Sequence, residues 1–235
     1  MARHSVLECS DSTNSGSGQT AVITLWGRKS SSNVQAAMWC LAELELDVHR
    51  IDAGIHYGVT KTPEYLAMNP NATVPTIKDG DNPPLWETGA ILRYLAGRYA
   101  QESFWPSTPQ ARMLIDQWCE WSKINVALNF TAPVFWRVFR TPPERQDPAA
   151  IQQALQVLEK YLHIADKQLS EHEFLVGDCL TLADIQFGHV LYRYFDIDIE
   201  RPELEHVVRY YQALADRPAY RSHVMISYEE LRNTL

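Results

Sequence analysis

The stretch "AVITLWGRKSSSNVQAAMWCLAELELDVHRI", residues 21–51, sets the fold of the first part of this 235-residue chain. Its opening run, "AVITLW", is short, apolar and β-branched, which is typical of a buried strand. From Asn33 onward apolar residues recur at helical spacing, and "DVHRI" (47–51) is predicted to be a second strand. A strand, a helix and a strand joined by tight connections form a βαβ unit, so we expect parallel pairing with a right-handed crossover.

The segment that follows completes a small α/β domain. "TIK" and "PLW" flank the turn-rich "DGDNPP", a pattern that predicts a short hairpin. Residues 87–99 have apolar side chains on one helical face. The order β-α-β followed by β-β-α predicts a compact α/β domain that closes near residue 100.

The second half of the chain is predicted to be all-helical. Helical patterns cover residues 110–139, 149–169, 182–194 and 204–216, and we find no convincing strand there. Pro133 should kink or split the first of these helices, because proline lacks an amide donor and crowds the preceding turn. We therefore expect a disordered N-terminal extension (1–20), an α/β domain (21–100), a linker (101–109) and an all-α domain (110–235).

Composition excludes several classes of function. A net charge of −8 supplies no basic surface for nucleic acid. No apolar run approaches the roughly 20 residues that span a bilayer, and the first twenty residues lack the apolar core of a signal peptide. The four cysteines are far apart and form no C-x-x-C motif, which suits a reduced cytoplasm. No motif for a metal or a nucleotide is present.

The hydroxyl cluster, three serines followed by an asparagine (Ser30-Ser31-Ser32-Asn33), lies between the first predicted strand and its helix. One interpretation is an N-cap, in which a side-chain oxygen accepts a hydrogen bond from a free amide of the first turn. The other is an anion site, because a helix start after the first strand of a βαβ unit stabilises negative charge. A serine there can donate a hydrogen bond to a bound thiolate and lower its pKa. These residues alone leave both interpretations open.

Three other motifs accompany this cluster. Val74-Pro75 opens the third predicted strand, a position where proline removes no ladder hydrogen bond. Glu87 and Thr88 begin the next helix, where they either cap it or hold the ammonium and carboxylate of an amino acid. Thr181-x-x-Asp184 is a capping box, for which we expect a purely structural role.

In this order and spacing, four segments resemble the cytosolic glutathione transferase family, over roughly residues 21–231. They are "SSSN", "NPNATVPTI", "ETGAILRYLA" and "GDCLTLADI". The resemblance, to bacterial-type members with a serine- and asparagine-containing loop, implies a thioredoxin-like N-terminal domain, a helical-bundle C-terminal domain, a homodimer and glutathione as co-substrate. It also implies that Pro75 is cis and that the Val74 backbone pairs with the cysteinyl part of glutathione.

Within that resemblance, Ser31 matches the thiol-activating hydroxyl of serine-type members, with Ser32 and Asn33 as close alternatives. Glu87 and Thr88 match the pair that holds the γ-glutamyl group. Two departures from the family pattern concern the anchoring of carboxylates: Ala72 stands in place of a histidine and Gly89 in place of an arginine. Anchoring of glutathione must then be weaker or use other cations, for which the candidates are Arg28, Lys29 and Lys61.

The implied function is a cytoplasmic, detoxifying glutathione transferase that activates the thiol for attack on a small apolar electrophile. Trp118, Trp121 and Trp136 are candidates for the apolar substrate pocket. Two alternatives stay open. One is a glutathione-dependent peroxidase or disulfide-bond reductase, and the other is a non-catalytic binding module, which Ala72 and Gly89 favour.

Overall fold

The computed structural model describes residues 22–235, and its N-terminal half is a four-stranded mixed sheet with helices packed on it. The strands β1 (Ile23–Trp26), β2 (Val48–Ile51), β3 (Thr76–Asp79) and β4 (Leu85–Trp86) are arranged in the order β2-β1-β3-β4. β1 pairs with β2 in parallel and with β3 antiparallel, and β3 pairs antiparallel with β4. The predicted βαβ unit and hairpin are confirmed. The extension predicted over residues 1–20 lies outside the described residues.

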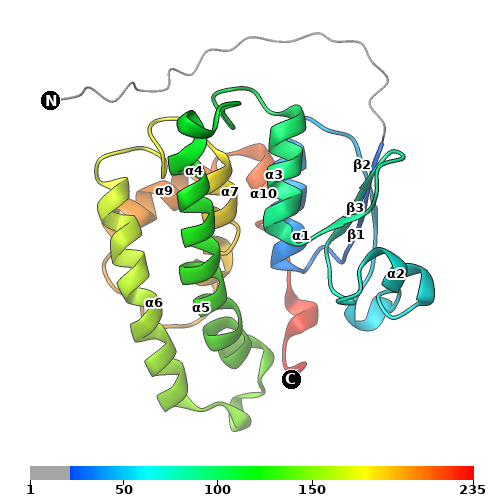
Figure 1. Ribbon diagram of the computed structural model, residues 1–235. Helices are drawn as coiled ribbons and strands as arrows, with labels where there is room; N and C mark the ends of the chain where they lie inside the picture. The colour runs from blue at the N-terminus through cyan, green and yellow to red at the C-terminus, as the bar shows by residue number, and fades with distance from the viewer. Residues whose placement is uncertain (1–21) are drawn as a thin grey trace, which may run out of the picture.

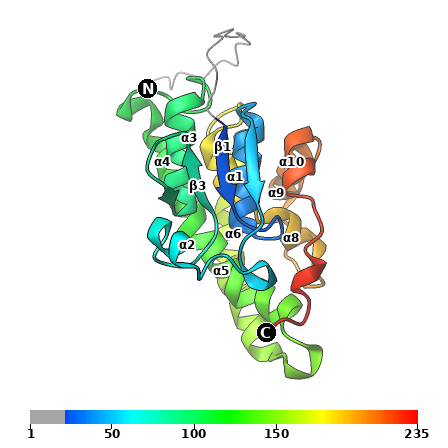
Figure 2. The same cartoon turned by 90° about the vertical axis from the view of Figure 1, so that its right-hand side faces the viewer.

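Two helices separate this sheet from the helical half of the molecule (Figures 1 and 2). They are α1 (Ser32–Glu43) and α3 (Thr88–Tyr99), and α1 is buried on both sides because small residues such as Ala36 and Ala37 alternate with larger apolar ones. α3 is fastened to β3 where the hydroxyls of Tyr94 and Tyr99 each donate to the buried Asp79 carboxylate at 2.6 Å. A short helix that we did not predict, α2 (Pro63–Met68), begins with the Thr62 cap.

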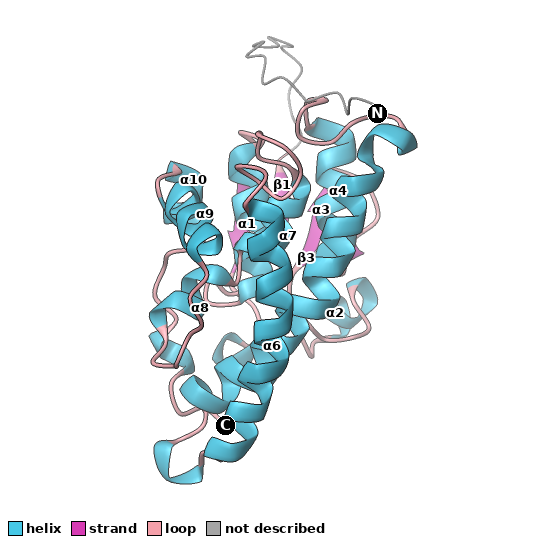
Figure 3. Cartoon of the chain, turned by 90° about the vertical axis from the view of Figure 1, so that its left-hand side faces the viewer, coloured by secondary structure: helices cyan, strands magenta, loops and turns pink. Residues whose placement is uncertain are grey.

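Helices fill the second half (Figure 3). α4 (Pro109–Trp121), η2 (Ser122–Ala127), α5 (Leu128–Phe130) and η3 (Thr131–Arg140) follow one another without a break. Pro133 does not split this helix, because residues 131–140 adopt a wider, π-type winding that keeps the chain helical around the missing amide donor. The expected split is therefore wrong, while the expected kink stays a prediction.

The remaining helices agree with the predicted ranges, with two differences. α6 (Pro148–Leu169) and α9 (Glu205–Ala215) are as expected, but residues 182–194 form two helices, α7 (Leu182–Gly188) and α8 (Leu191–Asp196). α10 (Pro218–His223) was not predicted. Short 3-10 turns complete the chain: η1 (Ile55–Tyr57), η4 (Pro143–Arg145) and η5 (Glu229–Leu231).

The two halves are locked together by close packing against α1. A Cβ on Gly188 of α7 would lie only 3.0 Å from the Trp39 ring of α1 and 2.6 Å from Leu214 of α9, so only glycine fits there. Arg217, just before α10, forms a two-pronged pair with Glu43 at 2.8 and 2.6 Å. α1 is therefore held in a fixed relation to the helical half.

Candidate functional site

The site predicted from the hydroxyl cluster lies where β1 leads into α1. Ser31 is the residue that precedes the helix, and its backbone is extended. The first amides of a helix have no partner within the helix itself. No side chain caps α1, so the expected cap by a cluster hydroxyl is wrong at this helix. The backbone instead turns through a hydrogen bond from Ser31 N–H to the Arg28 carbonyl at 3.1 Å.

The four side chains of the cluster have different surroundings. Ser30 is buried and its hydroxyl donates to the Glu230 carboxylate near the C-terminus. Asn33 accepts a hydrogen bond from the Lys123 ammonium at 3.4 Å. Within residues 22–235 the hydroxyls of Ser31 and Ser32 form no hydrogen bond, and of the two only Ser31 precedes the helix. Ser31 and Ser32 thus both carry uncommitted hydroxyls at the helix start, and Ser31 occupies the N-cap position.

The Val74–Pro75 peptide bond is cis, as the resemblance implied. Across from it, Gly54 has a φ of 89°, a left-handed conformation that favours glycine. A Cβ there would lie 3.2 Å from Nη1 of Arg28 and 3.6 Å from Val74, so the absent side chain leaves room for the Arg28 guanidinium beside Val74.

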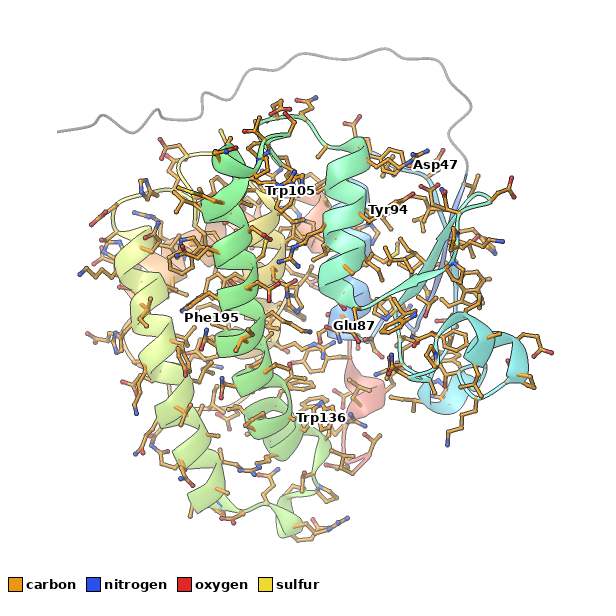
Figure 4. The ribbon with its side chains drawn as sticks, viewed as in Figure 1. Asp47, Glu87, Tyr94, Trp105, Trp136 and Phe195 are labelled. Carbon is orange, nitrogen blue, oxygen red and sulfur yellow. The ribbon has the colours of Figure 1, made fainter. Side chains whose placement is uncertain are left out.

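Glu87 stands at the start of α3, exposed, with a φ of 69° (Figure 4). A non-glycine residue in this conformation is strained by about 1–3 kcal/mol, and such strain is concentrated at functional sites. The neighbouring Thr88 is buried, with 3 % of its surface exposed, and forms the first helical position. A residue that only capped the helix would adopt an unstrained backbone conformation. The strain at Glu87 therefore favours a carboxylate placed for binding.

Lys123, on η2, is a site residue that the sequence analysis did not identify. Its ammonium contacts Asn33, and burial lowers its pKa while the Glu87 charge opposes that shift. Lys123 therefore lies between the start of α1 and the start of α3. Its only signal in the sequence is a single cation within the otherwise uncharged stretch 121–136.

The other predicted residues are placed as follows. Lys61 is exposed and forms no hydrogen bond or ion pair within the described part of the chain. Trp118 and Trp121 pack edge to face at 4.8 Å, and Trp121 also faces Tyr161 of α6, so both contribute to packing within the helical half. Trp136 on η3 is 37 % exposed.

Other kinds of site find no support in the described residues. Within 22–235 there is no group of three or more side chains that could hold a metal ion. The helices over the same range include none that is long and apolar enough to cross a membrane.

Comparison with known proteins accounts for this arrangement. Residues 21–97 match the N-terminal domain of glutathione S-transferases and residues 129–218 match their C-terminal domain. The chain is also 35% identical over 206 residues to glutathione S-transferase GstB of Escherichia coli, an alignment that covers 87% of this chain and 99% of GstB. This chain belongs to the glutathione S-transferase family.

Two further members of the glutathione S-transferase family resemble it over nearly their whole length. A theta class glutathione S-transferase from Xanthomonas axonopodis pv. citri, solved with glutathione bound, is 41% identical, with a TM-score of 0.83, and the match covers 89% of this chain and all of that one. Glutathione S-transferase 3 of Zea mays is 31% identical over 211 residues, which cover 87% of this chain and 94% of the maize protein. The thioredoxin-like N-terminal domain and helical C-terminal domain are those of the family.

Proposed function

We propose that this chain is a glutathione transferase in which the Ser31 hydroxyl donates a hydrogen bond to the sulfur of bound glutathione. The thiol loses its proton to solvent, and the thiolate sulfur then attacks an electrophilic carbon. A carbon–sulfur bond forms while the bond to the leaving group breaks, and the leaving group departs with the electron pair. The single observation that carries this assignment is the unpartnered Ser31 hydroxyl beside the uncapped start of α1.

The physical basis is the preference of this position for the charged form of the thiol. Free amides at a helix start carry a partial positive charge, and no side chain of the described residues caps those of α1. A donor hydroxyl and a nearby ammonium, that of Lys123, add to the same field. A thiol has a pKa of about 8.5 in water, and such surroundings lower it toward neutrality.

The remaining contacts follow from the same placement. The Val74 backbone next to cis-Pro75 pairs with the cysteinyl part of glutathione, while Glu87 binds the γ-glutamyl ammonium and Thr88 the carboxylate beside it. Lys61 is the cation proposed for the glycyl end. Two features support this pattern: Glu87 is strained yet exposed, and Thr88 lies at the first position of α3.

The setting of this activity is part of the proposal. The enzyme works in the cytoplasm as a homodimer, in detoxification of small electrophiles. Support for the dimer comes from Met113 and Leu114 on α4, which are 62% and 41% exposed and leave an apolar surface for a second copy. Sedimentation equilibrium at micromolar concentration should give twice the mass of one chain, and a monomer would contradict the dimer.

The decisive experiment is to titrate the bound thiol by its ultraviolet absorbance in Ser31→Ala. Removal of the donor should raise the thiol pKa and slow turnover near neutral pH, while affinity for glutathione changes little because many other contacts remain. Ser32→Ala is the matched control, since its hydroxyl is equally unpartnered within the described residues but lies one residue later. A pKa shift in Ser32→Ala alone would transfer the role to Ser32.

Two other results would point away from a transferase. Reduction of a peroxide or mixed disulfide without conjugation of any electrophile would favour the peroxidase or reductase chemistry. Binding of glutathione with no turnover at all would indicate a non-catalytic module.

A further inference from the structure

Three arginines from distant parts of the chain converge beside the start of α1, although the whole chain has a net charge of −8. Arg28 follows β1, Arg140 ends η3 and Arg193 lies on α8. Burial, together with the charges of Arg28 and Arg140, lowers the pKa of Arg193 to about 10. Contacts link the three positions as well: Arg193 donates to the carbonyl of Ser30, two residues after Arg28, and packs on Phe135, whose ring stacks on that of Phe139, the residue before Arg140.

Ion pairs do not offset this charge. Several other arginines of the chain pair with a carboxylate within 4.0 Å, as Arg93 does with Asp116 and Arg217 with Glu43. None of the three converging arginines has such a partner within residues 22–235. A cluster of this kind is costly unless something else supplies negative charge.

Arg193 has a structural role in the cluster. It is 3% exposed, and it donates to the Ser30 carbonyl at 2.6 Å and to the Gln35 side chain at 3.2 Å. Its guanidinium also lies 4.8 Å from the centre of the Phe135 ring. These contacts hold the loop before α1 against the helical half, so Arg193 is not free to bind a ligand.

Arg28 is differently placed. Its Nε is buried and has no hydrogen-bond partner among residues 22–235. Its Nη1 lies beside the open space at Gly54, next to Val74. Burial lowers the pKa of Arg28, and the charge of Arg140 acts in the same direction. Arg28 thus has donor capacity that the described part of the chain does not use.

Arg140 is the last residue of η3. Its Nε donates to Thr234 at 3.0 Å, and its guanidinium lies 4.9 Å from the centre of the Trp136 ring. Neither of its terminal amino groups forms a hydrogen bond within the described residues, and the side chain is partly exposed. Arg140 thus presents two free donors next to an aromatic surface.

Among the described residues one carboxylate acts on Arg28, that of Glu230, which opposes the lowering of the Arg28 pKa. It already accepts from the Ser30 hydroxyl, and it lies 3.5 Å from the Tyr57 hydroxyl and 3.6 Å from the His56 ring. A single negative charge leaves the cluster with an excess of positive charge.

We propose that the second substrate is an electrophile that carries a carboxylate, which Arg28 and Arg140 bind while its apolar body packs on the Trp136 ring. A planar guanidinium binds a carboxylate through two parallel hydrogen bonds, so two such groups on one carboxylate also orient the reacting carbon. This inference rests on the proposed function, because the thiolate held by Ser31 and the carboxylate held by Arg28 must belong to one site. The two residues share the loop between β1 and α1, where Ser31 N–H donates to the Arg28 carbonyl.

The test compares two electrophiles of the same shape, 4-(chloromethyl)benzoate and 4-(chloromethyl)benzamide, of which only the first is charged. In both, the thiolate sulfur attacks the benzylic carbon, the carbon–sulfur bond forms, and chloride leaves with the electron pair. The measured quantity is kcat/KM for each compound divided by its uncatalysed rate constant with glutathione. The wild-type enzyme should prefer the benzoate by about tenfold or more, as a charge-assisted contact predicts.

Arg140→Gln should remove most of that preference, about tenfold, with little change for the benzamide. Arg140→Lys should restore part of it. Arg137→Gln is the matched control, because Arg137 lies on the same helix but donates to the Ala150 carbonyl at 3.0 Å. Continued turnover of the benzamide shows that each variant is folded.

Two results would overturn the inference while leaving the proposed function intact. One is equal turnover of the two compounds by the wild-type enzyme. The other is an Arg140→Gln variant that slows both compounds equally and raises KM for glutathione, since the cluster would then hold a carboxylate of glutathione itself. Turnover of neither compound would instead count against the proposed function, and the inference would fall with it.

Discussion

His189, at the end of α7, should make the stability of this protein depend on pH. The residue is 1% exposed, and burial lowers its pKa to about 3, with the charges of Lys123 and Arg193 acting in the same direction. The imidazole is therefore neutral in the folded protein at all pH values above about 4. In the unfolded chain it titrates near its ordinary value of about 6.5.

The sign and size of the effect follow from proton linkage. Between pH 6.5 and about 3 the unfolded state binds one more proton at His189 than the folded state does, so stability falls as the pH is lowered. With these two pKa values, His189 alone removes about 2 kcal/mol of the free energy of unfolding between pH 7 and pH 5.

Urea denaturation at pH 7 and pH 5 measures this loss. The His189→Gln variant, which cannot titrate, should lose about 2 kcal/mol less than the wild-type protein over the same interval, whatever its stability at pH 7. His163→Gln is the control, because His163 is exposed and lies 3.4 Å from Glu159. An identical pH dependence of the wild-type protein and His189→Gln would contradict the linkage assigned to this residue.

Two further substitutions separate binding from folding. Glu87→Gly should lower glutathione affinity about tenfold or more in titration calorimetry, yet leave the free energy of unfolding unchanged or raise it by about 1 kcal/mol, because glycine relieves the strain at φ 69°. Unchanged affinity would contradict the γ-glutamyl assignment. Asp184→Ala should lower the free energy of unfolding by about 3–5 kcal/mol, while the folded variant still binds glutathione. The loss is large because this buried carboxylate accepts hydrogen bonds from Leu175 N–H, from Thr181 N–H and O–H, and from the Tyr210 hydroxyl. A loss under about 1 kcal/mol in chemical denaturation would show that these donors find other partners.

The capping box is a local pattern that predicted where a helix begins but not how strongly its residues stabilise the fold. Thr181-x-x-Asp184 predicts a helix start, and α7 begins there with the capping box present. Loss of a helix cap alone lowers the free energy of unfolding by about 0.5–2 kcal/mol. The larger effect expected here comes from Leu175 and Tyr210, which reach Asp184 only when the helices pack.

For the hydroxyl cluster too, the sequence predicted the position, whereas tertiary contacts decided the hydrogen bonds. Its position between a strand and a helix could be predicted, because the change of hydrophobic period from about two to about 3.6 marks the junction. The sequence could not predict which hydroxyls lack a hydrogen-bond partner, because the Ser30 hydroxyl donates to Glu230, which lies near the other end of the chain. The resemblance to the family, and not the local chemistry, singled out Ser31.

Local signals in the chain were sufficient for the elements and their order: the βαβ unit, the hairpin and most of the helices. These signals are periodicity, turn residues and caps, which depend on neighbours within a few positions. The contact of Lys123 with Asn33 and the convergence of Arg28, Arg140 and Arg193 depend instead on how the two halves pack. Charges that converge from separate elements leave no periodic trace in the chain, and their effect arises from burial and distance, which exist only after folding.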